Sequence, residues 1–180
     1  MSFNDTDFIR LADNHEILPF TCGDDDDDKD LNNFLLNDSK DYSNKLLAVT
    51  YLLESKGITS AFFCVSNDNI SIEKLDSKNQ FRKKFRKRMP TNKQFDTYPA
   101  VKIGRLAIHT DFQKMGFGSS LIDFIKGWFI TNNRTGCMYL LVDAYRKSIP
   151  FYLKNDFIFL GEKDASSKTR VMYYDLTQLL

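Results

Sequence analysis

Two glycines, Gly116 and Gly118, stand one residue apart directly ahead of an apolar run in the segment "DFQKMGFGSSL". The first amides of a helix have no acceptor within the helix, and with the helix dipole they bind anions such as phosphate. Glycine suits such a site because a side chain would hold the anion away from the amides. Ser119 and Ser120 add hydroxyl donors, and Lys114 adds a positive charge. The segment therefore predicts either a tight strand-to-helix turn or a cradle for a phosphate or pyrophosphate.

The spacing of the glycines narrows the choice of phosphate ligand. A Rossmann fingerprint needs a third glycine three residues after the second, where Leu121 stands. A Walker loop needs Gly-Lys followed by Ser or Thr, which this segment lacks. What is present is Q-x-x-G-x-G, from Gln113 to Gly118, after the apolar stretch "IGRLAI".

Hydrophobic periodicity predicts the elements that position this loop. Strands are expected at 8–12, 45–54, 58–66, 99–110, 137–145, 157–162 and 170–176. Helices are expected at 31–42 with Asp30 as the cap, after the glycines, and at 148–156. The aspartate run at 24–28 predicts a solvated loop, and 67–69 a turn. The order predicts a mixed sheet flanked by helices, with βαβ character through 100–160.

Length and composition are typical of one class of protein, a soluble globular domain. At 180 residues, with 42% hydrophobic and 27% charged residues, the chain fits one soluble globular domain spanning 1–180. A net charge of +1 gives no global argument for nucleic acid or for a membrane surface. The start lacks the pattern of a signal peptide, and no apolar run reaches the ~18 residues of a membrane span. We expect a cytoplasmic protein without a membrane partner.

The three cysteines are widely spaced and form no CxxC pair. The two histidines, His15 and His109, complete no plausible zinc site with them. We therefore expect reduced, buried cysteines and no metal.

Two blocks of the sequence resemble the GNAT acyltransferase superfamily. They are "VKIGRLAIHTDFQKMGFGSSLIDFI" and "VDAYRKSIPFYLKNDFIFLGE", in the family's order, and the element order matches over most of residues 8–176. The resemblance implies an α/β (α+β) fold with a mixed, mostly antiparallel sheet. Its central parallel strands, 101–109 and 137–142, would splay apart to admit the thioester of acetyl-CoA.

The resemblance also implies which residues bind acetyl-CoA and which residue acts as the general acid. Backbone groups of Leu106, Ala107 and Ile108 would bind the pantetheine arm. Main-chain amides of the loop would hold the pyrophosphate, through Gln113, Lys114, Met115, Gly116, Phe117, Gly118 and Ser119. Tyr152 would protonate the departing thiolate, since a phenol can donate a proton as charge develops on sulfur. Asp156 stands where the family has glycine, but aspartate tolerates a left-handed backbone.

The resemblance implies that a primary amine attacks the thioester directly in a ternary complex. His109 and Asp143 are candidates for the base, although both could be ordinary surface residues. The acidic run at 24–28 could attract a cationic acceptor or be inert surface.

The segment "RKKFRKR" at 82–88 holds six basic residues around Phe85. It predicts either a solvated face or a patch that contacts phosphates, for example of tRNA. The family includes toxins that acetylate aminoacyl-tRNA, and "IGRLAI" resembles the strand of that branch. The acceptor thus stays open between a small-molecule or protein amine and aminoacyl-tRNA. A non-catalytic acyl-CoA or partner-binding module is also open, as are a homodimer and an antitoxin partner.

Overall fold

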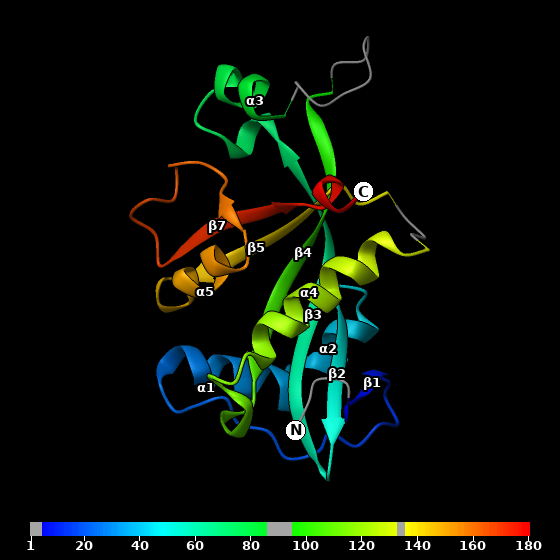
Figure 1. Cartoon of the computed structure of the whole chain (residues 1–180). Coiled ribbons are helices and arrows are strands. Elements are labelled where there is room, and N and C mark those ends of the chain that lie inside the picture. The colour runs from blue at the N-terminus through cyan, green and yellow to red at the C-terminus, as the bar shows by residue number, and fades with distance from the viewer. Residues whose placement is uncertain (1–4, 86–94, 133–135) are drawn as a thin grey trace. The chain divides into compact units, whose positions relative to one another are not determined.

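The computed structural model describes residues 5–85, 95–132 and 136–180 (Figure 1). The β-strands are β1 (Asp7–Arg10), β2 (Val49–Ser55), β3 (Ile58–Ser71), β4 (Thr97–Ile108), β5 (Tyr139–Tyr145), β6 (Ile158–Phe159) and β7 (Thr169–Asp175). The α-helices are α1 (Asp26–Asn33), α2 (Ser39–Asn44), α3 (Lys78–Phe85), α4 (Phe117–Ile130) and α5 (Ile149–Lys154). A π-helical segment, η2 (Phe34–Asp38), joins α1 to α2, and short 3-10 turns precede α3, α4 and α5 and end the chain.

The strands form one seven-stranded sheet in the order β1-β2-β3-β4-β5-β7-β6. The pairs β1–β2, β2–β3, β5–β7 and β6–β7 are antiparallel. Strands β4 and β5 are parallel, because the chain crosses between them through α4. The predicted mixed, mostly antiparallel fold with a central βαβ unit is therefore confirmed.

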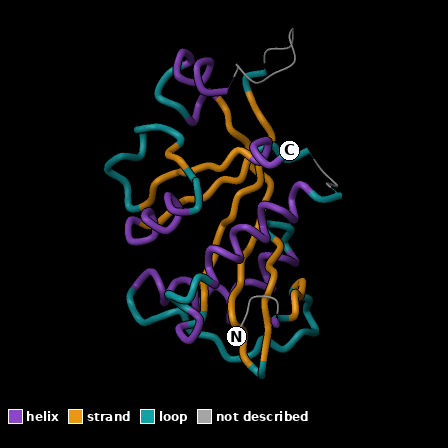
Figure 2. Tube along the Cα trace, in the orientation of Figure 1, coloured by secondary structure: helices purple, strands orange, loops and turns teal. Residues whose placement is uncertain are grey.

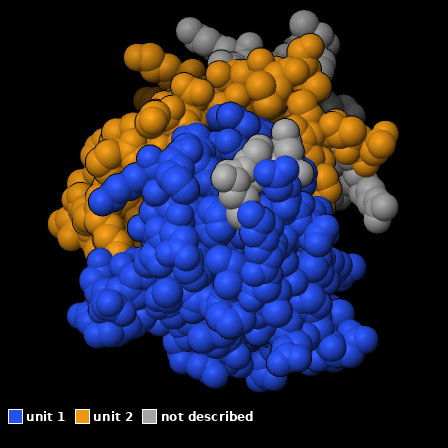
Figure 3. All heavy atoms as spheres, turned by 60° about the horizontal axis from the view of Figure 1, so that its bottom comes forward, with its two compact units in different colours: residues 1–66, 103–126 blue, residues 67–102, 127–180 orange. Residues whose placement is uncertain are grey.

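The chain divides into two compact units, coloured separately in Figure 3. Unit 1 comprises residues 1–66 and 103–126, and unit 2 comprises residues 67–102 and 127–180. In unit 1, α1, η2 and α2 pack on a core that contains Phe34, Leu35 and Phe62. In unit 2, α3 inserts Phe81 and Phe85 into a core rich in tyrosines. The burial of Phe34 and Leu35 follows the predicted helical spacing, whereas the burial of Phe81 and Phe85 was not predicted.

The predicted acidic loop at 24–28 is wrong, because α1 already begins at Asp26. The cap is Asp25, not Asp30: its backbone is extended, and its carboxylate accepts from the amide of Asp28 at 2.9 Å. Carboxylates in a first helical turn face the positive end of the helix dipole, which offsets their mutual repulsion. The aspartate run therefore starts a helix one turn earlier than composition suggested.

Other boundaries also differ from the prediction; for example, the strand expected at 157–162 is only Ile158–Phe159. Residues 67–69 form no turn, because β3 continues to Ser71. There Lys74 pairs with Asp68 and also donates to the carbonyl of Asn69 at 2.7 Å, which satisfies polar groups that would otherwise favour a turn. Strand β2 begins only at Val49, because Lys45 and the residues after it complete the end of α2.

The cysteines are free, as predicted, with Cys22 and Cys64 buried and Cys137 half-buried. Among the residues that the structure describes, no helix is long and apolar enough to cross a membrane.

Candidate functional site

The loop between β4 and α4 lies in unit 1, and in Figure 2 it leads directly into the helix. Two of its residues are left-handed, Lys114 with φ 61° and Gly116 with φ 82°. The amide of Ser120 donates to the carbonyl of Gly116 at 3.1 Å. Since this is an i→i−4 bond at the start of α4, Ser120 is the first amide that donates within the helix, and the amides of residues 117–119 come before it. These amides stand at the positive end of a 14-residue helix.

The two glycines have different roles. Gly116 supplies the left-handed turn, and a Cβ built on it would meet no atom within 4 Å, so the space beside it is open. Gly118 lies inside the first turn of α4 and is not a turn residue. The other left-handed position of the loop is Lys114, and this conformation strains a lysine by about 1 kcal/mol or more.

Gln113 braces the loop rather than facing outward with its side chain. Its Nε2 donates to the carbonyl of Cys22 at 2.7 Å and to the carbonyl of Ile108 at 2.9 Å. The segment at Cys22 is itself held by Asn32, which accepts from the Cys22 amide at 2.9 Å and donates to the carbonyl of Gly23 at 3.0 Å. The segment that leads into α1, held by Asn32 near the end of that helix, therefore fixes the end of β4 and the loop together. Asn32 was not predicted, because nothing in its local pattern separates it from other helical asparagines.

The predicted pantetheine strand, residues 106–108, is the end of β4. The amide of His109 donates to the carbonyl of Ser60 in β3 at 2.9 Å. Backbone groups alternate from edge to edge along a strand. Leu106 and Ile108 therefore direct theirs to the edge of β4 away from β3, and Ala107 directs its own toward β3. Of the three predicted backbone partners, Leu106 and Ile108 have the suitable orientation.

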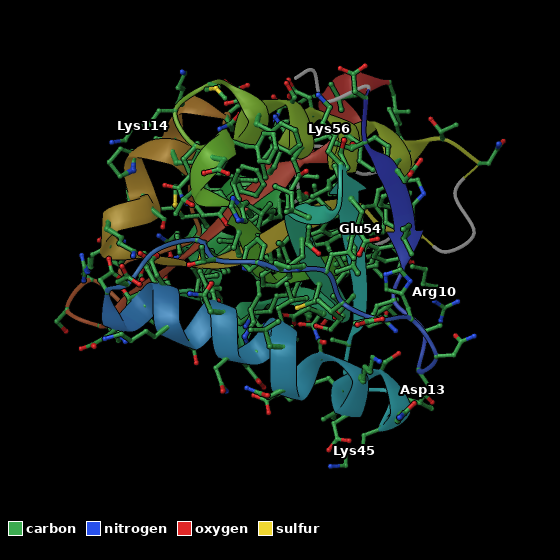
Figure 4. All side chains as sticks on the ribbon, turned by 90° about the horizontal axis from the view of Figure 1, so that it is seen from below. Arg10, Asp13, Lys45, Glu54, Lys56 and Lys114 are labelled. Atoms are coloured by element: carbon green, nitrogen blue, oxygen red, sulfur yellow. The ribbon has the colours of Figure 1, made fainter. Side chains whose placement is uncertain are left out.

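The remaining loop residues divide between surface and core. Lys114 projects from the loop ahead of α4 (Figure 4), and Met115 is 62% exposed. Phe117 is buried, with its ring 5.4 Å from that of Phe112. Ser119 is half-buried in the first turn of α4. The chain thus anchors the helix start through one phenylalanine and leaves its polar groups at the surface.

Tyr152 lies in unit 2, on the short helix α5, whose first turn holds Pro150. Its ring is 5.1 Å from that of Phe151 and 5.4 Å from that of Phe157. This burial raises the pKa of Tyr152 well above its ordinary value, so the phenol stays protonated. The turn after α5 keeps Asp156 at φ 64°, which confirms that aspartate can replace glycine there.

The two candidate bases both have partners. Nδ1 of His109 accepts from the amide of Asp111 at 3.2 Å, so one ring nitrogen caps the chain's own turn. Lys102 lies 2.5 Å from Asp143, across β4 and β5 in unit 2. Neither residue is a preformed base, and the pairing of Lys102 with Asp143 was not predicted.

In the described part of the basic segment, residues 82–85, two basic side chains are exposed and one is partly buried. Arg82 and Lys83 are exposed on α3. Lys84 turns inward and donates to the carbonyls of Phe159 at 3.0 Å and Leu160 at 2.9 Å. Partial burial lowers its pKa. The other predicted basic positions, 86–88, lie outside the described residues. Within the described residues, no three His, Cys, Asp or Glu side chains gather into a candidate metal site.

Comparison with known proteins finds one family model that matches part of the chain. Residues 84–157 match the model of the acetyltransferase (GNAT) family, which confirms the resemblance noted in the sequence. No curated protein sequence matches the chain.

Several solved structures are similar over nearly the whole chain. A tyrosine-to-phenylalanine mutant of KacT has a TM-score of 0.69 at 23% identity, covering 98% of this chain and 99% of that one. AtaT complexed with acetyl-methionyl-tRNAfMet has a TM-score of 0.70 at 20% identity, covering 97% of each chain. AtaTR bound with acetyl-CoA has a TM-score of 0.69 at 19% identity, covering 98% of this chain and 96% of that one. At these identities the likeness shows the fold.

Proposed function

We propose that this chain, whose residues 84–157 match the acetyltransferase (GNAT) family model, moves an acetyl group from acetyl-CoA to a primary amine. The observation that carries the proposal is the loop before α4. Lys114 and Gly116 have left-handed φ values directly before α4, and a Cβ built on Gly116 would meet no atom within 4 Å. A pyrophosphate binds free amides at the positive end of a helix. AtaTR, which has this fold, binds acetyl-CoA.

In the proposed reaction the acceptor first loses a proton to solvent, and the neutral nitrogen attacks the thioester carbonyl. A C–N bond forms and the nitrogen loses its second proton to solvent, while the C–S bond breaks and the sulfur leaves with the electron pair of that bond. Tyr152 donates its proton to this sulfur and is reprotonated from solvent. A phenol that burial keeps neutral is suited to this role, because it holds its proton until charge develops on the thiolate.

For the acceptor we propose the amino group of an aminoacyl-tRNA. Two observations favour it over a free polyamine. AtaT, a structure of the same fold, was solved with acetyl-methionyl-tRNAfMet. Arg82 and Lys83 are exposed side by side on α3 in this chain, where they can contact phosphates. An antitoxin of the kind bound by AtaT would be a further partner.

The test begins with calorimetry of the full chain against acetyl-CoA, with Gly118→Glu as the control. A carboxylate in the first turn of α4 would repel the pyrophosphate, so we expect saturable binding that the substitution abolishes. Acetylation of a mixed aminoacyl-tRNA pool, followed by mass spectrometry, then tests the acceptor. A folded protein without coenzyme binding would overturn the proposal in favour of a non-catalytic module. Binding without acetylated tRNA would overturn the acceptor alone.

A further inference from the structure

His109 stands between the end of β4 and the loop before α4, and its ring caps the turn at Thr110–Phe112. The amide of Asp111 donates to Nδ1 of His109 at 3.2 Å. A backbone amide can only donate, so Nδ1 must carry a lone pair and the neutral ring holds its proton on Nε2. The cap therefore depends on an uncharged imidazole.

Protonation of His109 would remove this acceptor. An imidazolium has a hydrogen on both ring nitrogens, so Nδ1–H would face the hydrogen of the Asp111 amide. A second partner stands close by, because Oδ2 of Asp111 lies 3.8 Å from Nδ1 and its side chain is 71% exposed. Asp111 thus offers its amide to the neutral ring and its carboxylate to the charged ring. The turn has two alternative arrangements, and uptake of one proton exchanges them.

The other neighbours of the His109 ring are apolar. Phe20, from the segment before α1, and Phe112, from the capped turn, lie edge to face with it, with ring centroids 5.9 Å and 6.2 Å away. The His109 side chain is only 12% exposed. Of the residues that the structure describes, Asp111 is the one acidic residue within 4.0 Å of a ring nitrogen of His109. The charge of the ring is therefore answered by Asp111.

The capped turn is in contact with the start of α4. Phe112, the last residue of the turn, is buried, and its ring centroid is 5.4 Å from that of Phe117, the first residue of α4. The backbone of His109 is fixed, because its amide donates to the carbonyl of Ser60 at 2.9 Å. A change at the His109 ring is therefore taken up by the turn and not by β4. Through Phe112, it reaches the first amides of α4.

We propose that His109 is a positioning residue whose protonation weakens the binding of acetyl-CoA. The inference rests on the proposed function, because it concerns the regulation of the loop assigned to the pyrophosphate. With a neutral ring the turn is capped, and the first amides of α4 are held in place for the ligand. With a charged ring Nδ1 turns to the carboxylate of Asp111, and the turn loses its cap.

The direction of the pH dependence follows from these two states. The charge on the imidazolium gives the pyrophosphate little attraction, because the carboxylate of Asp111 pairs with it. Loss of the cap therefore decides the sign. Acetyl-CoA binds more tightly near pH 8 and more weakly toward pH 5, the range in which imidazole changes its charge.

The first test follows the chain without coenzyme by NMR between pH 5 and pH 8. The chain has two histidines, so one variant assigns both imidazole signals. We expect the amide signals of Asp111 and Phe117 to titrate with the midpoint of His109. In His109→Asn both should stay constant, because the side-chain oxygen of asparagine caps the turn at every pH. An Asp111 amide that does not follow His109 would overturn the proposal.

The second test is calorimetry with acetyl-CoA at pH 8 and pH 5.5. The Kd of the wild type should rise about fivefold at the lower pH, the effect of losing one cap. His109→Asn should lose this rise, whatever part the phosphates of the coenzyme contribute, and His109→Ala should bind weakly at both values. The control is His15→Asn, because His15 is hydrogen-bonded to Glu54 at 2.9 Å, and Glu54 lies well apart from Lys114 in Figure 4. This variant should keep the wild-type profile.

Asp111→Asn tests the second arrangement of the turn. It keeps the amide that donates to the neutral ring and removes the carboxylate that pairs with the charged ring. The midpoint of the His109 titration should therefore move to lower pH. An unchanged midpoint would exclude the exchange of partners at Asp111.

The outcomes separate this inference from the proposed function. If the Asp111 amide follows His109 but acetyl-CoA binds at neither pH, the acetyltransferase assignment fails and the switch stands. If acetyl-CoA binds with the same pH dependence in the wild type and in His109→Asn, the proposed function stands and the role of His109 fails.

Discussion

The side-chain amide of Gln113 donates to the backbone carbonyl of Cys22 at 2.7 Å, across 91 residues of sequence. The same nitrogen donates to Ile108 at the end of β4. One side chain therefore joins the loop before α4 to the strand that precedes it and to the segment that leads into α1. In the sequence Gln113 is simply the first residue of Q-x-x-G-x-G, and the bond shows why a long amide is placed there.

Replacing Gln113 with alanine should weaken acetyl-CoA binding without unfolding the protein. The loop would lose two hydrogen bonds of about 1 kcal/mol each. Part of the binding free energy of acetyl-CoA would then be used to order the loop amides. We expect the Kd from calorimetry to rise by about tenfold. Gln80→Ala, which removes a hydrogen bond to Asp76 in unit 2, is the control and should leave the Kd unchanged. An unaltered Kd in the Gln113 variant would exclude a bracing role.

Alanine substitutions at Gly116 and Gly57 can separate the effect of backbone strain on stability from the effect of the loop on acetyl-CoA affinity. Both have φ of 82° and open space where a Cβ would stand, but Gly57 lies in the β2–β3 turn. Either substitution by alanine should cost about 1 kcal/mol, which lowers Tm by roughly 2–4 °C. Only Gly116→Ala should also weaken acetyl-CoA binding, by about tenfold, because its Cβ enters the space beside the helix amides. Equal affinities in the two variants would show that the loop is only a turn.

Tyr152→Phe should lower kcat by about a hundredfold or more while the Kd for acetyl-CoA stays the same, because only the proton donor is removed. Rapid-quench or steady-state kinetics with saturating acceptor measures this, and Tyr51→Phe in β2 serves as the control. A kcat within a factor of two of wild type would remove Tyr152 from the mechanism.

The same tyrosine makes a prediction about stability at high pH. Burial raises the pKa of Tyr152 in the folded chain above its ordinary value of 10. The unfolded chain therefore loses this proton first, and the stability that Tyr152 contributes below pH 10 decreases above it. Urea unfolding at pH 9 and pH 11 should show a smaller alkaline loss of stability in Tyr152→Phe than in wild type. An identical loss in both proteins would contradict the assigned burial.

Substitutions at neighbouring basic residues of α3 should have different effects: loss of Lys84 should lower stability, and loss of Arg82 and Lys83 should weaken tRNA binding. Lys84→Met removes two hydrogen bonds from a charged donor, worth about 1.5–3 kcal/mol, and should lower Tm by several degrees. The double variant Arg82→Gln, Lys83→Gln should keep Tm but bind tRNA more weakly. Its plot of log affinity against log salt should be shallower by about one for each lost phosphate contact. Full tRNA affinity in the double variant would assign both residues to the solvated surface.

The sequence by itself determined the features that depend on neighbouring residues. The loop and the helix start at Gly116, the order of strands and helices, and the left-handed turn at Asp156 all follow from local backbone preferences and periodicity. The loop predicted at 24–28 from the repulsion among its aspartates was wrong, because α1 begins at Asp26. The helix dipole and the cap at Asp25 outweighed that repulsion.

Only the tertiary structure decided which side chains meet. The bonds of Gln113 with Cys22, of Lys84 with Phe159 and of Lys102 with Asp143 join residues 91, 75 and 41 positions apart. Such partners are selected by the packing of strands and helices around each core, and no local pattern encodes them. These bonds show that Lys84 has a structural role, unlike the exposed Arg82 and Lys83. They also show that Asp143, a candidate base, is ion-paired with Lys102. The loop was therefore predictable from sequence, whereas the hydrogen bonds of Gln113 that brace it were not.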